Sequence, residues 1–327
     1  MFFWRPALQR APLYRQDFRG SMEMTLTLTI AQALARAGKL LKESGSGSPV
    51  LDADVLLSFI TGLDRAGLYR EGRRPLAPEE DSRYRELIRR RVLGEPVAYL
   101  TGEKEFMGIS FAVTPAVLIP RPETELLVET ALALLAGPGG AAGKRPGPGP
   151  AKSGGPVVIE AGAGSGAIAV SLAVELAGAL VYATDLSPAA LAVAQQNALR
   201  HGVGERVVFL CGDLLAPLEK AGAPRADLIA ANLPYIASGE IPGLPRDVRC
   251  YEPLLALDGG LDGLDLYRRL AGQSLAYLRQ GGHLLMEIGP RQAAAARALF
   301  SGPPWSVSVK KDLAGRDRLV VAERLEA

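Results

Sequence analysis

The sequence predicts a doubly wound α/β domain with a mostly parallel sheet, an antiparallel hairpin at one edge and a small helical bundle before it. Three observations support this. Downstream of Pro156, short runs that are apolar on both faces alternate with segments of helical periodicity, which is typical of a parallel sheet covered on both sides. The chain closes with two strand-like runs around residues 314–317. Residues 25–94 show apolar residues at helical spacing, separated by glycine and proline.

The N-terminal part of the chain is expected to be a tail followed by the bundle. Residues 1–24 carry arginines and few acids, but they lack the apolar core of about 7 to 15 residues that a secretory signal needs. We expect them to be disordered. Residues 25–95 are expected to form the bundle, and the arginine-dense helix at 83–91 is more typical of a solvated face than of a partner-binding one.

Residues 96–125 are expected to connect the bundle to the larger domain, which covers 126–327. A short hairpin is predicted in the connector by Phe106, Ile109, Phe111 and Val113. A helix should then start near Pro122. The Gly/Pro-rich run at 137–156 cannot bury enough apolar surface to order itself, so we interpret it as a surface insertion or linker.

In the larger domain, the sequence predicts strands that alternate with helices. The expected strands are VVIE (157–160), LVYATD (180–185), VVFLCGD (207–213), ADLIAANLPY (226–235) and HLLMEIG (283–289). The expected helices lie at 166–177, 188–201, 264–278 and 291–300. This order predicts a single sheet whose parallel strands are joined by helices.

Composition gives no support to several functional classes. The chain has 37 Lys+Arg against 35 Asp+Glu, so its near-zero net charge does not call for a polyanionic partner. Cys211 and Cys250 are far apart and match no metal-ligand spacing, which favours reduced thiols, no bound metal and a cytoplasmic location. No apolar run reaches the ~20 residues that span a bilayer, so we expect a soluble protein without membrane contact.

A glycine-rich turn indicates where a ligand binds. The first strand runs into Gly162, Gly164 and Gly166, and glycines permit positive φ and close approach of a ligand to the backbone. Asp185 ends the second strand, where a carboxylate can accept both hydroxyls of an adenosine ribose. This pattern suits an NAD enzyme or an S-adenosylmethionine enzyme, although the alternating glycines differ from the usual G-x-G-x-x-G of the former. Ser187 is better placed than Asp185 to cap the next helix.

Two further acids favour the methyl donor. Glu160 ends the first strand, where an acid could meet the cationic amino group of a methionine moiety. Asp213 follows the third strand, where it could accept from an adenine amino group while Leu214 packs against the ring. Each acid could instead be a turn or cap residue. Their positions at successive strand ends, where open α/β sheets bind ligands, favour the binding role.

The tetrad Asn232, Leu233, Pro234 and Tyr235 predicts the chemistry. An amide nitrogen is a poor nucleophile because its lone pair is delocalised, so a catalyst must fix the nitrogen and favour its pyramidalisation. The side-chain carbonyl of Asn232 and the backbone carbonyl of Leu233 can accept its two N–H bonds and direct the lone pair at a sulfonium methyl. Pro234 stiffens the turn and Tyr235 offers an aromatic wall. The alternative for this tetrad is a simple strand-ending turn.

The sequence resembles the PrmC/HemK protein-glutamine methyltransferases, which methylate the glutamine of the Gly-Gly-Gln motif in peptide chain release factors. The matching stretches are YLTGEKEFMGISFAV, LIPRPETE, EAGAGSGAIAV, NLPYI, YEPLLALDGGLDGLDLYRRL, LLMEIGPRQ and KDLAGRDRLVV. They run from Tyr99 to Val321. The resemblance implies the class I S-adenosylmethionine-dependent methyltransferase fold and a release factor as the protein substrate, with the helical bundle helping to dock it.

The resemblance also implies the roles of individual residues. Donor contacts are implied for Gly162, Ala163, Gly164, Ser165, Gly166, Asp185, Leu214 and Asn232, and substrate contacts for Asn232, Leu233, Pro234 and Tyr235. Three features depart from the family pattern. Leu233 stands where NPPY is the commonest form, Glu160 replaces an aspartate, and the run at 137–156 is long. Because position 233 contributes a backbone carbonyl, leucine leaves the proposed chemistry intact.

Three other functions remain open at this point. An S-adenosylmethionine-dependent amino methyltransferase that acts on a nucleic-acid base or another protein glutamine would share the tetrad, but a nucleic-acid enzyme would need a basic, aromatic-lined face. A dinucleotide-dependent oxidoreductase would share the glycines and Asp185 but would leave the tetrad unexplained. A non-enzymatic release-factor binder is the third.

Overall fold

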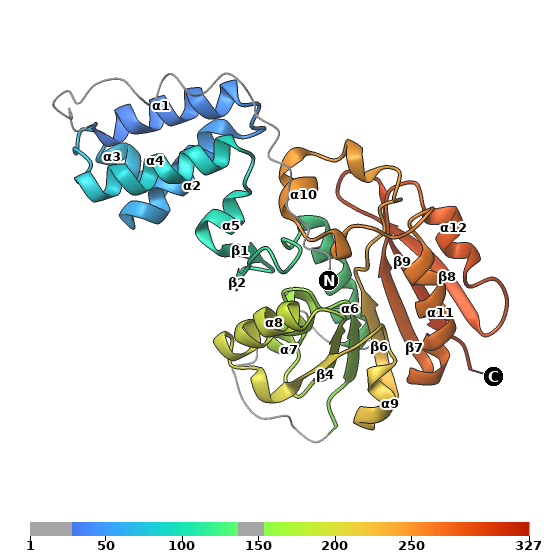
Figure 1. Cartoon of the computed structure of the whole chain (residues 1–327). Coiled ribbons are helices and arrows are strands. Elements are labelled where there is room, and N and C mark those ends of the chain that lie inside the picture. Colours follow the sequence, from blue (N-terminus) through green and yellow to red (C-terminus); the bar gives the residue numbers. More distant parts are fainter. Residues whose placement is uncertain (1–27, 137–153, 327) are drawn as a thin grey trace, which may run out of the picture. The chain divides into compact units, whose positions relative to one another are not determined.

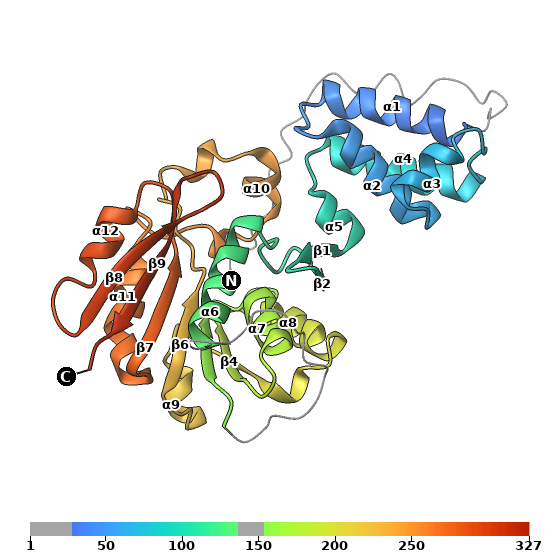
Figure 2. The ribbon, with the colours of Figure 1, turned by 180° about the vertical axis from the view of Figure 1, so that it is seen from behind.

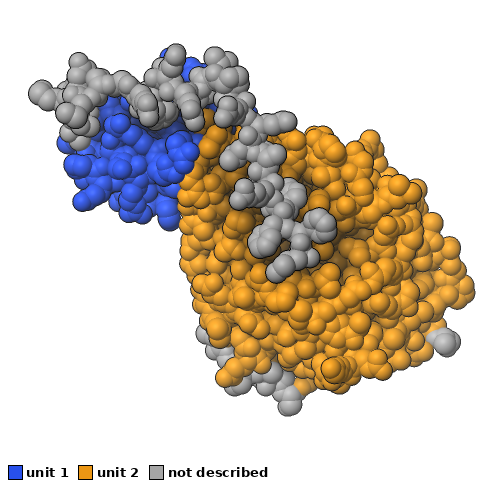
Figure 3. All heavy atoms as spheres, viewed as in Figure 1, with its two compact units in different colours: residues 1–89 blue, residues 90–327 orange. Residues whose placement is uncertain are grey.

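The computed structural model describes residues 28–136 and 154–326. The expected tail at 1–24 lies outside the described residues, as does most of the expected insertion at 137–156. The chain divides into two compact units, residues 1–89 and residues 90–327, which Figure 3 colours blue and orange.

The first unit is built from helices. It contains α1 (Ile30–Glu43), α2 (Pro49–Thr61), α3 (Arg65–Arg70) and most of α4 (Pro78–Val92). Thr29 starts α1 with a capping box, in which its hydroxyl accepts from the Gln32 N–H and the Gln32 side chain accepts from the Thr29 N–H. The buried residues of α1 recur every three or four positions and are Ile30, Ala33, Ala37 and Leu41. This periodicity gives the helix one face toward the core of the unit.

The second unit begins with a short helix and a hairpin. The elements are α5 (Val97–Thr101), β1 (Glu103–Phe106), β2 (Ile109–Ala112), the 3₁₀ turn η1 (Pro122–Thr124) and α6 (Glu125–Leu135). β1 and β2 pair antiparallel, and the rings of Phe106 and Phe111 meet edge to face with centroids 6.0 Å apart. Glu125 links the hairpin to α6, because its carboxylate accepts from the Met107 N–H at 2.8 Å.

The sheet is doubly wound and mostly parallel, as predicted. Its strands are β3 (Val157–Ala161), β4 (Leu180–Asp185), β5 (Val207–Cys211), β6 (Ala226–Ala231), β7 (Leu278–Glu287), β8 (Trp305–Lys311) and β9 (Asp317–Arg324). They lie in the order β5-β4-β3-β6-β7-β9-β8. The first five are parallel, whereas β9 is antiparallel to both of its neighbours. The predicted antiparallel edge hairpin is therefore β8 and β9.

Helices cover both faces of this sheet (Figures 1 and 2). Besides α6, they are α7 (Ala167–Glu175), α8 (Pro188–Arg200), α9 (Pro217–Ala221), α11 (Asp265–Tyr277) and α12 (Ala293–Ala298), while α10 (Arg246–Tyr251) has no buried residue and belongs to neither core cluster of the sheet. One core cluster joins α6, α7 and α8 to the sheet, and a second joins α9, α11 and α12 to it. The residues of β6 are all buried, which explains why this central strand is apolar from Leu228 to Ala231.

Within the larger domain, the structure differs from the sequence prediction most at α9, α10 and β7. α9 and α10 were not expected, because helices of five and six residues are too short to show a period. β7 begins at Leu278, whereas the prediction started it at His283. The intervening Arg279, Gln280, Gly281 and Gly282 have low strand propensity, so they hid the first half of the strand. In the described ranges, no helix combines the length and the apolar character that crossing a membrane requires.

Candidate active site

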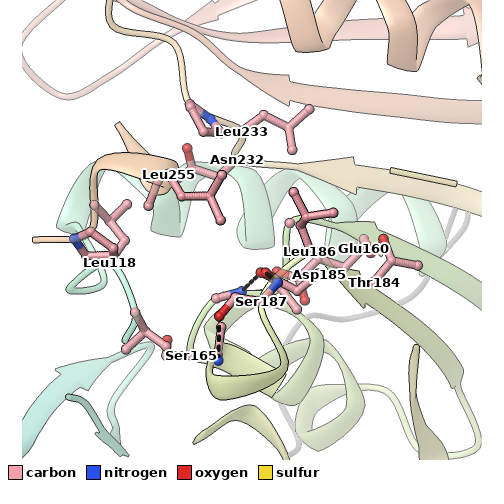
Figure 4. Close-up of a pocket in the computed structure, with 18 of the residues that line it drawn as sticks. Leu118, Glu160, Ser165, Thr184, Asp185, Leu186, Ser187, Asn232, Leu233 and Leu255 are labelled. Atoms are coloured by element: carbon pink, nitrogen blue, oxygen red, sulfur yellow. Dashed lines mark hydrogen bonds between the residues drawn. The ribbon is translucent and has the colours of Figure 1, made fainter. Parts of the chain in front are cut away.

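A cavity of about 360 Å³ lies where β3, β4 and β6 end. This is the edge at which open α/β sheets bind ligands, and the volume falls within the ~300–1,000 Å³ of small-molecule sites. Most of the predicted site residues line it: Glu160, Gly162, Ala163, Gly164, Ser165, Asp185, Asp213, Leu214, Asn232, Leu233 and Pro234. Figure 4 shows Asn232 and Leu255 across the cavity from Asp185 and Ser165. Gly166 and Tyr235 were also predicted and do not line it.

The glycine loop keeps its backbone close to the cavity. Gly162, Gly164 and Gly166 have φ of 81°, 53° and 77°, a region that side chains disfavour. A Cβ on Gly162 would stand 2.9 Å from Cδ2 of Leu233, and one on Gly166 would stand 3.0 Å from Cβ of Ala194. A side chain at either position would therefore have to displace its neighbour, in addition to the strain of a positive φ.

Asp185 joins the glycine loop to the end of β4. Its Oδ2 accepts from the Gly164 N–H at 2.8 Å, and its Oδ1 accepts from the Ser187 N–H at 2.8 Å. The Ser187 hydroxyl caps α8 by accepting from the Ala190 N–H, as the sequence predicts. Because each carboxylate oxygen can accept a second hydrogen bond, Asp185 keeps capacity for two ligand hydroxyls.

Glu160 is a buried acid at the wall of the cavity. Glu160 is 1% exposed. Its carboxylate accepts a hydrogen bond at 3.0 Å from the Ala169 N–H, which lies in the first turn of α7. Burial raises the pKa of Glu160 well above its usual range, and the charge of Asp185 raises it further, while the bond from Ala169 opposes the rise. A cation bound beside Glu160 would favour its ionised form.

Asp213 and Leu214 line the cavity beyond β5. Leu214 is buried with φ of 47°, so a strained backbone aims this side chain inward. The carboxylate of Asp213 forms an ion pair with Arg269 of α11, which also lines the cavity. One carboxylate oxygen is therefore shared with a guanidinium, a partner that the sequence did not suggest.

Asn232 directs a specific atom of its amide toward the cavity. Its Nδ2 donates to Oγ1 of Thr124 at 3.0 Å, and Thr124 is 4% exposed. The side-chain carbonyl oxygen is thus left for a ligand, as the chemistry predicted for the tetrad requires. Thr124 belongs to the LIPRPETE stretch, 108 residues before its partner, and was not among the predicted site residues.

Leu233 shows how leucine fits the second position of the tetrad. Unlike proline, leucine has a backbone N–H, and it donates this N–H to the hydroxyl of Tyr267 at 3.1 Å. Tyr267 is fully buried and donates its own proton to the backbone carbonyl of Glu287. The leucine is accommodated because this tyrosine on α11 supplies an acceptor.

Tyr235 was predicted to form an aromatic wall of the cavity, but it does not line the cavity. Its ring packs on the core cluster formed with α11 and α12, and its hydroxyl lies 3.5 Å from Oε1 of Glu287. Burial raises the pKa of Tyr235 to about 12. The ring therefore supports the tetrad from behind in this structure.

The loop of residues 253–263, after α10, packs closely against the backbone of the tetrad. A Cβ on Gly259 would stand 2.5 Å from the Pro234 carbonyl oxygen, and one on Gly263 would stand 2.2 Å from that of Tyr235. The side chain of Gln292 donates to the same Tyr235 carbonyl at 2.9 Å. These contacts explain why glycine stands at positions 259 and 263 of the LDGGLDG stretch.

Comparisons with known proteins identify the family of the chain. A family model of the PrmC N-terminal domain matches residues 32–102, and a methyltransferase domain model matches residues 158–248. A release factor glutamine methyltransferase from Moorella thermoacetica is 46% identical over 91% of this chain and 100% of its own length. Another from Geobacter sulfurreducens is 42% identical over 89% of this chain and 95% of its own length. The chain belongs to the release factor glutamine methyltransferase family.

Release factor glutamine methyltransferases use S-adenosylmethionine, which supports the cofactor predicted from the strand-end acids. A solved protein-(glutamine-N5) methyltransferase (release factor-specific) from Alicyclobacillus acidocaldarius is 29% identical and covers 66% of this chain and 100% of its own, with a TM-score of 0.38. The low TM-score leaves the family assignment to the sequence relatives.

Besides Arg269, three residues at or behind the tetrad escaped the sequence analysis: Thr124, Tyr267 and Glu287. Glu287 carried the same signal as Glu160, because both are acids that end an apolar strand. Thr124 and Tyr267 carried no local signal, since each acts on a residue far away in the sequence. All three lie in stretches that resemble this family.

Proposed function

We propose that the protein transfers a methyl group from S-adenosylmethionine to the side-chain amide nitrogen of the glutamine in the Gly-Gly-Gln motif of a peptide chain release factor. The observation that supports this most is the orientation of Asn232, whose Nδ2 donates to Thr124 and whose carbonyl oxygen is left for a substrate N–H. Translation ends in the cytoplasm, which is where we propose that the protein acts.

The residues around the cavity fit the methyl donor. The positive φ angles of Gly162, Gly164 and Gly166 and their lack of side chains suit close approach of the donor to the loop. Asp185 would accept the ribose hydroxyls with its remaining capacity, and Glu160 would face the ammonium group. Leu214 would pack on the adenine ring, while the ion pair of Asp213 with Arg269 leaves fewer sites for the adenine amino group.

Catalysis by this chain would consist of binding and orientation. When bound, the donor supplies a methyl group on a sulfonium centre. Asn232 and Leu233 would accept the two N–H bonds of the substrate amide with their carbonyl oxygens, which turns the nitrogen lone pair toward the methyl carbon. Pro234 keeps the turn rigid. No base is needed before attack, because the methylated nitrogen is a strong acid that releases its proton to water.

We also propose that the helical bundle helps to dock the release factor. One stripe of α2 supports this, because Leu51, Val55 and Phe59 recur every fourth residue and are 49%, 38% and 47% exposed. Large apolar side chains that share an exposed helical face are typical of protein-binding surfaces. The stripe is a better candidate than the arginine-dense face of α4, where Arg85 and Arg89 pair with acids of the same helix.

The reaction is tested with labelled S-adenosylmethionine and three acceptors in separate reactions: a release factor, its variant with alanine in place of the motif glutamine, and duplex DNA. We expect label on the intact release factor alone. Label on DNA, or equal label on the alanine variant, would overturn the proposed function.

The role of Asn232 is tested by Asn232→Ala. We expect turnover to fall by roughly a thousandfold or more, because a fixed acceptor for the reacting nitrogen is lost. Donor affinity, measured by calorimetry, should change by only a few fold. Turnover close to wild type would contradict the assigned role.

A further inference from the structure

A buried asparagine of α8 holds the glycine loop from behind, and it takes no part in the proposed reaction. Asn197 is fully buried, with an exposed fraction of 0%. Within the described part of the chain, its side-chain amide forms three hydrogen bonds, and all three go to backbone groups outside α8. Burying an amide costs free energy unless its polar atoms are paired, so these partners determine how the side chain lies.

One of the three bonds fixes the peptide between Ser165 and Gly166. The Ser165 carbonyl oxygen accepts from Nδ2 of Asn197 at 2.9 Å, and the Gly166 N–H donates to the Ala163 carbonyl at 2.7 Å. Ser165 lines the cavity and Asn197 does not, so the bond keeps the Ser165 carbonyl turned away from the ligand. A Cβ on Gly166 would stand 3.0 Å from Cβ of Ala194, also on α8. This peptide therefore cannot rotate without breaking hydrogen bonds at both of its ends.

The other two bonds orient the Asn197 amide. Its Oδ1 accepts from the Ala112 N–H at 2.8 Å, and its Nδ2 donates to the Ala112 carbonyl at 3.0 Å. Because a backbone N–H can only donate, its partner must be the amide oxygen. The amide nitrogen is then left to donate to the carbonyls of Ala112 and Ser165. Ala112 ends β2, so the hairpin determines which end of the amide faces the glycine loop.

We propose that Asn197 is a positioning residue of the donor site, which holds the peptide between Ser165 and Gly166 in the conformation that binds S-adenosylmethionine. This inference rests on the proposed function, and it deepens it by assigning the shape of the glycine loop to a residue that does not line the cavity. Without the bond from Nδ2, the Ser165 carbonyl would lose its partner, and it could regain one by rotating toward the water of the cavity. A merely structural role would lower stability and leave the donor affinity of the folded protein unchanged.

The decisive variants are Asn197→Leu and Asn197→Ala. Leucine is similar to asparagine in size and makes none of the three bonds, whereas alanine cannot overpack the site. With S-adenosylhomocysteine as the probe in calorimetry, we expect the dissociation constant to rise roughly tenfold in both variants, because a buried carbonyl of the loop loses its donor. With saturating donor and release factor, kcat should stay within about threefold of wild type, since the tetrad is untouched.

His201→Leu is the matched control. His201 follows α8 and contacts the same strand, because its Nε2 lies 2.8 Å from the Ser110 carbonyl oxygen, but it does not line the cavity. Its substitution removes a contact between α8 and β2 and spares the bond to Ser165. We expect the melting temperature to fall while the dissociation constant stays within about threefold of wild type. Equal losses of donor affinity in His201→Leu and Asn197→Leu, or wild-type affinity in both Asn197 variants, would overturn the inference.

A second measurement needs neither donor nor activity. In ¹⁵N-labelled donor-free protein, the Gly166 N–H reports on the peptide that Asn197 holds. We expect its hydrogen exchange to accelerate by roughly tenfold or more in both Asn197 variants and to stay nearly unchanged in His201→Leu. Unchanged exchange in both Asn197 variants would refute the positioning role. Neither this measurement nor the calorimetry uses a release factor, so a wild-type protein that labelled no release factor would refute the proposed function instead.

Discussion

Two acids, Glu160 and Glu287, end two strands of the same sheet, and their surroundings differ. Both are 1% exposed, so burial is the largest cause of the raised pKa of each carboxyl. Glu160 lines the cavity where a cation would bind, whereas Glu287 lies behind the tetrad. The raised pKa therefore bears on donor binding at Glu160 alone.

Glu160→Gln tests the donor-binding acid through the pH dependence of stability. Because the folded pKa of Glu160 is raised above its unfolded value, its protonated carboxyl stabilises the fold below the unfolded pKa, and this contribution is lost as pH rises through the folded pKa. Glutamine stays neutral throughout. Without donor, the melting temperature of the variant should therefore be higher than that of wild type at pH 8 and equal to it at pH 4.

The same variant should bind the donor more weakly. Loss of a charged partner costs about 2 kcal/mol, or roughly thirtyfold in affinity at pH 8, measured by calorimetry. Wild-type affinity should rise with pH, because binding a cation beside Glu160 requires its ionised form. A variant that melts like wild type at pH 8 and binds the donor equally well would contradict this assignment.

At the scale of elements, the site depends on how closely the loop of residues 253–263 packs on the tetrad. Gly263 has φ of 78°, and an added Cβ would lie 2.2 Å from the Tyr235 carbonyl oxygen. The loop can reach the tetrad only because this position lacks a side chain.

Gly263→Ala should displace this loop and the tetrad together. We expect a loss of about 2–4 kcal/mol in the free energy of unfolding, from backbone strain plus overlap, and a larger loss in kcat than in donor affinity. Gly272→Ala is the control, because Gly272 lies in α11 with open space around it and should gain about 1 kcal/mol. Similar behaviour of the two variants would show that the close packing is unimportant.

The sequence predicted most of the strands and helices that position the site. It did not predict the hydrogen bonds that orient the tetrad. The strands from β3 to β6 were visible because buried parallel strands are continuous apolar runs, and their ends placed Glu160, Asp185 and Asn232 correctly at one edge. Tyr235 was expected in the cavity and instead packs on the core behind it. Thr124 and Tyr267 were missed, because hydrogen bonds between distant segments leave no trace in local periodicity.

At the scale of the whole molecule, the two units suggest a division between substrate docking and chemistry. The chain carries 37 basic and 35 acidic residues, so its overall charge gives little attraction to a partner of either sign. The exposed apolar stripe of α2, formed by Leu51, Val55 and Phe59, is then the better candidate for recognition of a protein substrate.

Replacing the three residues of this stripe by serine should weaken docking without affecting the chemistry. We expect KM for the release factor to rise roughly ten- to a hundredfold, with kcat and donor affinity nearly unchanged. Leu313→Ser, at a fully exposed leucine in the β8–β9 turn, is the control and should leave KM as it is. An unaltered KM in the triple variant would remove α2 from the docking surface.

The most direct test is a crystal structure of the protein with S-adenosylhomocysteine and a peptide that contains the Gly-Gly-Gln motif. The account predicts that the glutamine amide nitrogen lies about 2.7–3.2 Å from both the Asn232 side-chain carbonyl oxygen and the Leu233 backbone carbonyl oxygen. An amide nitrogen bound elsewhere, with the Asn232 carbonyl turned toward Thr124, would contradict it.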